Sequence, residues 1–133
     1  MRGRVLRVDV RPGNPAWPPL LLCNGIGASL EVLQPFVDAL DPRREVIRFD
    51  LPGVGGSPLP VLPYHLATLS ALLTGLLDRL GHDRADVLGI SWGGGLAQQL
   101  RCGGPGGCAA WCWWPPAPAR SWCPAGRGCC GTR

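Results

Sequence analysis

The chain has 133 residues, with 20 glycines, 15 prolines and a formal net charge of +4, and this length can form one small domain with a modest core. All nine acidic residues lie at or before Asp86, so the first hundred residues are formally neutral and the excess charge comes from the four arginines beyond them. Those arginines are scattered among Gly, Pro and Trp and form no basic patch, so nucleic acid is not expected as a partner.

The amino-terminal segment does not have the pattern of a signal peptide. Residues 1–9 carry positive charge, but no apolar stretch follows them. The longest apolar runs elsewhere are too short to span a membrane. These observations predict a soluble, cytoplasmic protein.

Short apolar runs bounded by turn residues predict four strands, at residues 5–10, 20–23, 45–50 and 86–90. The run from Leu20 to Cys23 is continuously apolar, which is typical of a strand buried on both faces.

Helical segments are expected between these strands. Ser29 is a candidate cap for a short first helix, and Pro35 either kinks that helix or begins a second turn at Phe36. Leucines recur at helical spacing over residues 66–80, and Gly81 is a natural stop. Because strands separated by helices favour parallel pairing, the predicted fold class is α/β, with a three-layer parallel sheet.

Glycine-rich loops follow three of the strands, at residues 24–28, 51–57 and 89–95. Functional residues of such sheets gather at the carboxyl ends of the strands. The last loop contains G-x-S-x-G around Ser91, between an apolar strand and a helical pattern that begins at Ala97. Strand, sharp turn and helix form the context of a nucleophile elbow, which predicts Ser91 as a catalytic nucleophile. The alternative interpretation of this segment is a glycine-rich turn with an incidental serine.

A serine that attacks a carbonyl group needs two N–H donors for the oxyanion that forms. One is expected from the residue after the nucleophile, Trp92, and the other from the loop after the central strand, where Ile26 is the candidate. The alternative for that loop is a plain strand-to-helix turn. A dinucleotide site is not expected there because Leu30 occupies the third glycine position, and no other cofactor and no metal is predicted.

Three runs carry a family resemblance: NGIGA at residues 24–28, DLPGVGGS at 50–57 and GISWGG at 89–94. Together they resemble the α/β-hydrolase superfamily. Their particular form resembles intracellular poly(3-hydroxyalkanoate) depolymerases, from about Val5 to Leu100. The resemblance implies an incomplete α/β-hydrolase domain over residues 1–100, an ester or polyester substrate, and a polyester granule surface as partner. Another α/β-hydrolase, such as an esterase or a haloperoxidase-like enzyme, and a non-catalytic truncated product are the alternatives.

The catalytic triad that this resemblance implies is incomplete. In this superfamily an acid and then a histidine follow the nucleophile along the chain. Here no Asp, Glu or His follows Ser91. His65 and His82 both precede it and are predicted to be solvated surface or turn histidines. We therefore expect little or no esterase activity.

Residues 101–133 hold six of the seven cysteines and four of the six tryptophans, without an acidic residue. No C-x-x-C pair and no histidine accompanies them, so neither a zinc site nor a disulfide module is predicted. Read one base earlier, the codons of residues 111–115 encode an apolar run typical of a buried strand. We therefore hypothesise a change of reading frame near residues 100–102. The tail would then be irregular or disordered and foreign to the fold, and the elbow strand would be an unpaired sheet edge.

Overall fold

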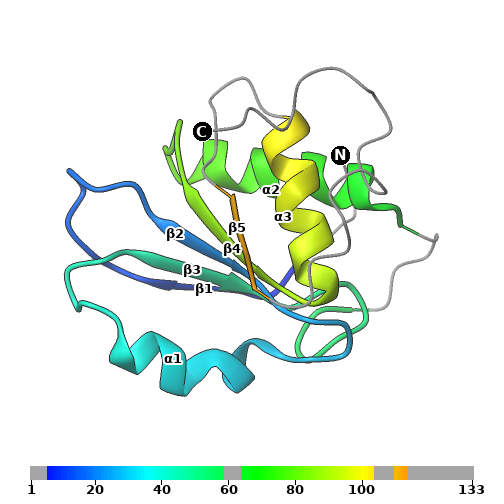
Figure 1. The fold of residues 1–133 in the computed structure, drawn as a ribbon, viewed down its shortest axis with the longest axis horizontal. Helices are drawn as coiled ribbons and strands as arrows, with labels where there is room; N and C mark the ends of the chain where they lie inside the picture. Colours follow the sequence, from blue (N-terminus) through cyan, green and yellow to red (C-terminus); the bar gives the residue numbers. More distant parts are fainter. Residues whose placement is uncertain (1–5, 59–63, 104–109, 114–133) are drawn as a thin grey trace.

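The computed structural model describes residues 6–58, 64–103 and 110–113, of which residues 101–103 and 110–113 are described by their backbone alone. Within these residues five strands form one sheet, in the order β1-β3-β2-β4-β5. The strands are β1 (Val8–Arg11), β2 (Leu20–Cys23), β3 (Val46–Phe49), β4 (Asp86–Ile90) and β5 (Ala110–Trp113). The helices are the 3₁₀ helix η1 (Leu30–Leu33), α1 (Gln34–Ala39), α2 (Leu66–Arg79) and α3 (Trp92–Gly103). Figure 1 shows α1 on one face of the sheet and α2 and α3 on the other, so the predicted three-layer α/β architecture is confirmed.

The sheet is mixed, which corrects the prediction of a wholly parallel one. β2 pairs in parallel with β3 and β4, but β1 pairs with β3 in the antiparallel sense, with Val8 opposite Phe49 and Arg11 opposite Val46. A parallel connection needs a long crossover, usually a helix. The segment between β1 and β2 contains no helix, so the chain reverses direction there. The start of the first predicted strand, at Val5, lies outside the described residues.

The elbow strand β4 is not the edge of the sheet, contrary to the prediction. Helix α3 continues to Gly103, and β5 then pairs in parallel with β4, from Val87 opposite Ala110 to Ile90 opposite Trp113. Part of the segment predicted to be irregular is thus a strand. Its apolar and aromatic composition suits a strand, and α3 supplies the crossover that parallel pairing requires. Residues 114–133 lie outside the described residues.

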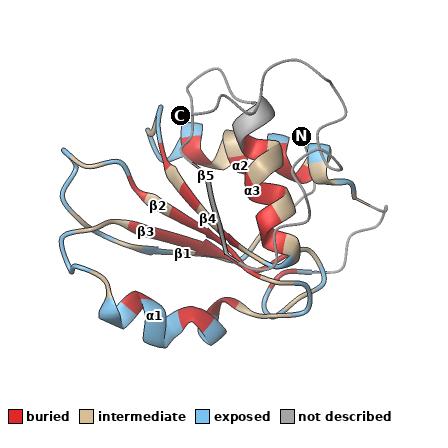
Figure 2. Ribbon diagram, in the orientation of Figure 1, coloured by how far each residue is buried: buried red, intermediate tan, exposed pale blue. Residues whose placement is uncertain are grey.

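The core has two parts, one on each face of the sheet (Figure 2). Leu21 and Val87 pack with residues of α2 and α3, whereas Leu22 and Val46 pack with Val37 of α1. Neighbouring residues of β2 therefore enter opposite clusters. The prediction that this strand is buried on both faces is confirmed, because helices cover both sides.

The helices follow the predicted pattern, and the second of the two predicted roles of Pro35 is the one observed. Pro35 lies in the first turn of α1, so it begins a helix rather than kinking one. Ser29 stands at the cap position of η1, but its side chain makes no capping hydrogen bond. α2 ends as predicted, with Gly81 at a φ of 81° and the N–H of His82 donating to the carbonyl of Leu77 over 2.9 Å.

In the described part of the chain no helix has the length and apolar character needed to cross a membrane. The same residues contain no group of three His, Cys, Asp or Glu side chains that could hold a metal ion.

Candidate active site

The backbone at Ser91 forms a strained turn. Ser91 separates β4 from α3 and has a φ of 54°, and no other non-glycine residue in the described ranges has a positive φ. Such a backbone costs on the order of 1–3 kcal/mol and persists only where the surrounding structure enforces it. The N–H of Gly94 donates to the carbonyl of Ser91 over 2.9 Å and closes the turn. The chain therefore has the strand, turn and helix of a nucleophile elbow at the predicted position.

Two glycines of the elbow are required by close backbone contacts. A Cβ atom on Gly93 would lie 2.1 Å from the carbonyl oxygen of Cys23, at the end of β2. A Cβ atom on Gly89 would lie 2.3 Å from the carbonyl oxygen of Gly93. Any side chain at either position would push β2, β4 and α3 apart. The G-x-S-x-G spacing is thus a packing requirement of the turn.

The loop that follows β2 lies beside the elbow. A Cβ atom on Gly25 would be 3.8 Å from the Cβ atom of Ser91, which is ordinary van der Waals contact. The loop forms a turn in which the N–H of Ala28 donates to the carbonyl of Gly25 over 3.2 Å. Ile26 lies within this turn and is 73% exposed.

The amides of Ile26 and Trp92 belong to the two segments that meet at Ser91. Trp92 is the first residue of α3, so its N–H has no acceptor within the helix. Ile26 donates no hydrogen bond to any residue in the described ranges. The indole of Trp92 packs edge-to-face against Tyr64, with ring centroids 6.4 Å apart, which holds the segment before α2 against the elbow. The structure brings the predicted nucleophile and donor segments together at one edge of the sheet.

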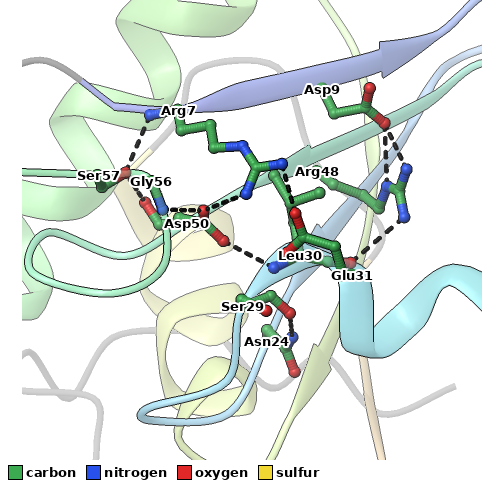
Figure 3. Close-up of polar contacts among 10 residues, drawn as sticks. All are labelled: Arg7, Asp9, Asn24, Ser29, Leu30, Glu31, Arg48, Asp50, Gly56 and Ser57. Atoms are coloured by element: carbon green, nitrogen blue, oxygen red, sulfur yellow. Dashed lines mark hydrogen bonds and ion pairs between the residues drawn. The ribbon is translucent and has the colours of Figure 1, made fainter.

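The remaining glycine-rich loop, at residues 51–57, is organised around the buried carboxylate of Asp50. This residue follows β3, is fully buried, and accepts hydrogen bonds from the N–H of Leu30 at 2.7 Å and of Gly56 at 2.8 Å. The hydroxyl of Ser57 donates to the carbonyl of Asp50 over 2.7 Å and accepts the N–H of Arg7 at 2.9 Å. Figure 3 shows these contacts. Asp50 belongs to a run that carries the family resemblance, but its contacts were not predicted.

The two histidines differ, and the prediction for His82 is partly wrong. His65 is exposed just before α2, as predicted. His82 lies in a turn but is half-buried, and its Nε2 lies 3.0 Å from Oε1 of Glu45. Both partners precede parallel strands, whereas Ser91 follows one. Since the five residues of β4 span about 16 Å at ~3.3 Å per residue, His82 is too far from Ser91 to act on it.

Comparison with known families agrees with this geometry. The model of the alpha/beta hydrolase fold family matches residues 18–102, which include the strands β2, β3 and β4 and the elbow. The chain therefore belongs to the α/β hydrolase fold family.

Individual relatives narrow the comparison. A poly(3-hydroxyalkanoate) depolymerase of Ectopseudomonas oleovorans is 54% identical over 95 residues, which are 71% of this chain and 34% of that protein. A 3-oxoadipate enol-lactonase of Acinetobacter baylyi is 35% identical over 83 residues, 62% of this chain and 31% of that protein. A hydrolase of Pseudomonas aeruginosa superposes with a TM-score of 0.66 at 38% identity, covering 76% of this chain and 37% of that structure. The chain spans about a third of the length of these two curated relatives.

Proposed function

We propose that this chain carries the nucleophile and the oxyanion-stabilising loop of a serine-dependent ester hydrolase. The observation that carries the proposal is the positive φ of Ser91, at a turn where the segment around Gly25 lies in contact distance. A strained serine between a strand and a helix exposes its hydroxyl group at the carboxyl edge of the sheet.

The chemistry would proceed by acyl transfer. The hydroxyl oxygen of Ser91 attacks the ester carbonyl, and the N–H groups of Ile26 and Trp92 stabilise the negative charge on the tetrahedral oxygen. The alcohol leaves, and water then hydrolyses the acyl-enzyme. Each step needs a base that takes up a proton and later returns it. No metal and no organic cofactor enters this scheme.

The base and the acid that would orient it are the missing components. Residues 92–133 contain no Asp, Glu or His, and His82 lies at the other end of the strands. We therefore propose that the chain as written has little or no hydrolytic activity, although its nucleophile segment is assembled.

A change of reading frame near residues 100–102 remains our explanation for the absent acid and histidine. The test is to resequence the locus and read the downstream DNA in the alternative frame. An Asp or Glu followed by a His in that frame would support the proposal. An in-frame gene whose genuine product ends in the Cys- and Trp-rich tail would contradict it.

For the substrate class we propose a polyester of hydroxyalkanoic acids, at the surface of a granule in the cytoplasm. The support is the 54% identity to the depolymerase, compared with 35% to the enol-lactonase. Small esters and lactones are the second candidate, because the lactonase match covers 62% of the chain. The test uses the full-length protein that the locus encodes once the proposed reading frame is restored. Its activity on suspended polyester granules is compared with its activity on enol-lactone, and the preferred substrate distinguishes the two candidates.

The activity of the chain itself is tested with p-nitrophenyl alkanoates. We expect the purified 133-residue protein and its Ser91→Ala variant to give the same rate as buffer. Clear turnover that the substitution abolishes would show that a base is present and would contradict the proposal.

A further inference from the structure

Two charge pairs lie side by side where β1 meets β3 (Figure 3). Asp9 of β1 stands opposite Arg48 of β3 in the strand register, and Arg48 Nε donates to Asp9 Oδ2 over 3.2 Å. The second pair joins the residue before β1 to the residue after β3. Arg7 Nη1 donates to Asp50 Oδ2 over 3.2 Å, and the N–H of Asp50 donates to the carbonyl of Arg7 over 3.0 Å. We call these four residues the charged box.

The charged box binds both backbone polar groups of Leu30, its N–H and its carbonyl. Asp50 Oδ1 accepts the N–H of Leu30 at 2.7 Å, and Arg48 Nη1 donates to its carbonyl over 3.3 Å. Leu30 is the first residue of η1, directly after the loop that contains Ile26. Two charges of opposite sign, Arg48 in β3 and Asp50 directly after it, thus fix the point at which that loop ends.

Burying these charges costs free energy, so stability alone does not explain the charged box. Arg48 is 6% exposed and Asp50 is fully buried. Removing charged groups from water costs several kcal/mol per ion after relaxation, and apolar residues of similar volume often serve stability as well or better. The cost is explained if the box determines a conformation, because charge-assisted hydrogen bonds are directional in a way that apolar contacts are not.

The loop between β2 and Leu30 is short and internally bonded, so its two ends determine where Ile26 lies. Its start is fixed by the pairing of Cys23 with Gly89 in β4. Its own closure comes from Asn24, whose Nδ2 donates to the carbonyl of Ser29 over 2.9 Å. A shift at Leu30 would therefore be passed to the turn that contains Ile26.

Glu31 shields the outer side of the box. It forms an ion pair with the guanidinium of Arg7, and the hydrogen bond with Arg7 is the main reason that the pKa of Glu31 falls to about 2. Arg7 is thereby held between Glu31 and Asp50, next to the first residues of η1.

We propose that the charged box is a positioning device for the oxyanion-hole loop, in which Asp50 and Arg48 set the place of the Ile26 amide through Leu30. The inference rests on the proposed function, because Ile26 acts as an oxyanion donor only in that function. Misplacement of such a donor by about 1 Å can reduce catalysis on the order of a hundredfold.

The test uses the full 133-residue chain labelled with ¹⁵N and compares Asp50→Asn with Asp41→Asn. Asp50→Asn keeps the shape of the side chain but replaces one carboxylate oxygen by an NH₂ group. That group cannot accept a hydrogen bond from the N–H it faces. Asp41 is an exposed carboxylate paired with Arg43, so its substitution makes the same chemical change outside the box. Amide hydrogen exchange and amide chemical shifts are measured for both variants.

We expect Asp50→Asn to accelerate exchange at Leu30 about tenfold, as the loss of a charged hydrogen bond implies, and to shift the amide resonance of Ile26. Amides of β4 should change less than about twofold, and Asp41→Asn should change none of these signals. Unchanged signals at Leu30 and Ile26 in the Asp50 variant overturn the proposal. Loss of protection that is equal in β4 and in the loop also overturns it, because Asp50 would then serve only general stability.

A second measurement applies if Asp50→Asn fails to fold. In the unsubstituted chain the Leu30 amide must exchange at least about tenfold more slowly than the Ile26 amide, since Leu30 donates to Asp50 and Ile26 donates to no residue in the described part of the chain. Equal rates would contradict the proposal. None of these signals depends on ester hydrolysis, so failure of the proposed function is identified separately, from the reactivity of Ser91 described below.

Discussion

The two ends of the parallel strands differ in both side chains and backbone. At the amino ends, Glu45 pairs with half-buried His82, and Arg44 pairs with Asp86. At the carboxyl ends, Ser91 has a strained backbone and Ile26 is largely exposed beside it. The comparison teaches that titratable groups alone do not locate a site. The proposed site is distinguished instead by backbone strain and an exposed neighbouring loop, for which packing alone gives no reason.

The largest effect should come from closing the space at the elbow. Gly93→Ala places a Cβ atom 2.1 Å from the carbonyl oxygen of Cys23, so the free energy of unfolding should fall by about 3 kcal/mol. Urea denaturation followed by circular dichroism measures it. Gly75→Ala is the matched control: nothing lies within 4 Å of its Cβ position in α2, so it should stabilise the protein by about 0.5–1 kcal/mol. Equal effects at both positions would contradict the close packing of the elbow.

The next largest effect on stability is expected at the amino ends of the strands, away from the candidate site. His82→Ala leaves the largely buried carboxylate of Glu45 without its partner, which should cost about 1.5 kcal/mol of unfolding free energy. The substitution should leave the reactivity of Ser91 unchanged. A loss of that reactivity without a loss of stability would assign a chemical role to His82 and break the comparison between the two ends.

A smaller effect of opposite sign is expected at Ser91 itself. Ser91→Gly removes the penalty of a positive φ, so thermal and urea unfolding should show a gain of about 0.5–1 kcal/mol. Ser91→Ala keeps a Cβ atom and should give no such gain. If both variants have the stability of the parent chain, the strain at the elbow is not real.

The smallest effect concerns the outer side of the charged box. The pKa of Glu31 falls from its ordinary 4.5 to about 2 in the folded chain, mainly through its hydrogen bond with Arg7. A lowered folded-state pKa stabilises the protein above about pH 4.5, and this contribution disappears as the pH falls toward 2. Glu31→Gln should therefore lose less stability than the parent chain when urea midpoints are compared across that range. Equal losses would contradict the pairing.

Much of the fold follows from local sequence, and the limits have physical causes. β2 and β4 begin and end at the predicted residues because continuous apolar runs and turn residues bound them. The predicted direction of β1 was wrong because the residue pattern of a strand does not show which neighbour it will pair with. β5 was missed because its short apolar run lies in a segment without other signals.

In the candidate site, too, local features could be predicted and long-range contacts could not. Ser91 could be predicted because strand, turn and helix are contiguous there. The contacts of Asp50 with Leu30 and Arg7 could not, because they join residues 20 and 43 positions apart. The pairing of His82 with Glu45 spans 37 positions for the same reason. Interactions between distant segments depend on the assembled sheet rather than on any local pattern.

If Ser91 is a positioned nucleophile without a general base, an external base should restore its reactivity. Intact-mass and peptide spectrometry after incubation with an alkyl fluorophosphonate test it, with and without added imidazole as an external base. We predict one phosphonyl adduct, on Ser91, that forms only with imidazole and is absent from Ser91→Ala. No adduct on Ser91 under either condition, or equal modification of the buried Ser57 and Ser70, would contradict the account.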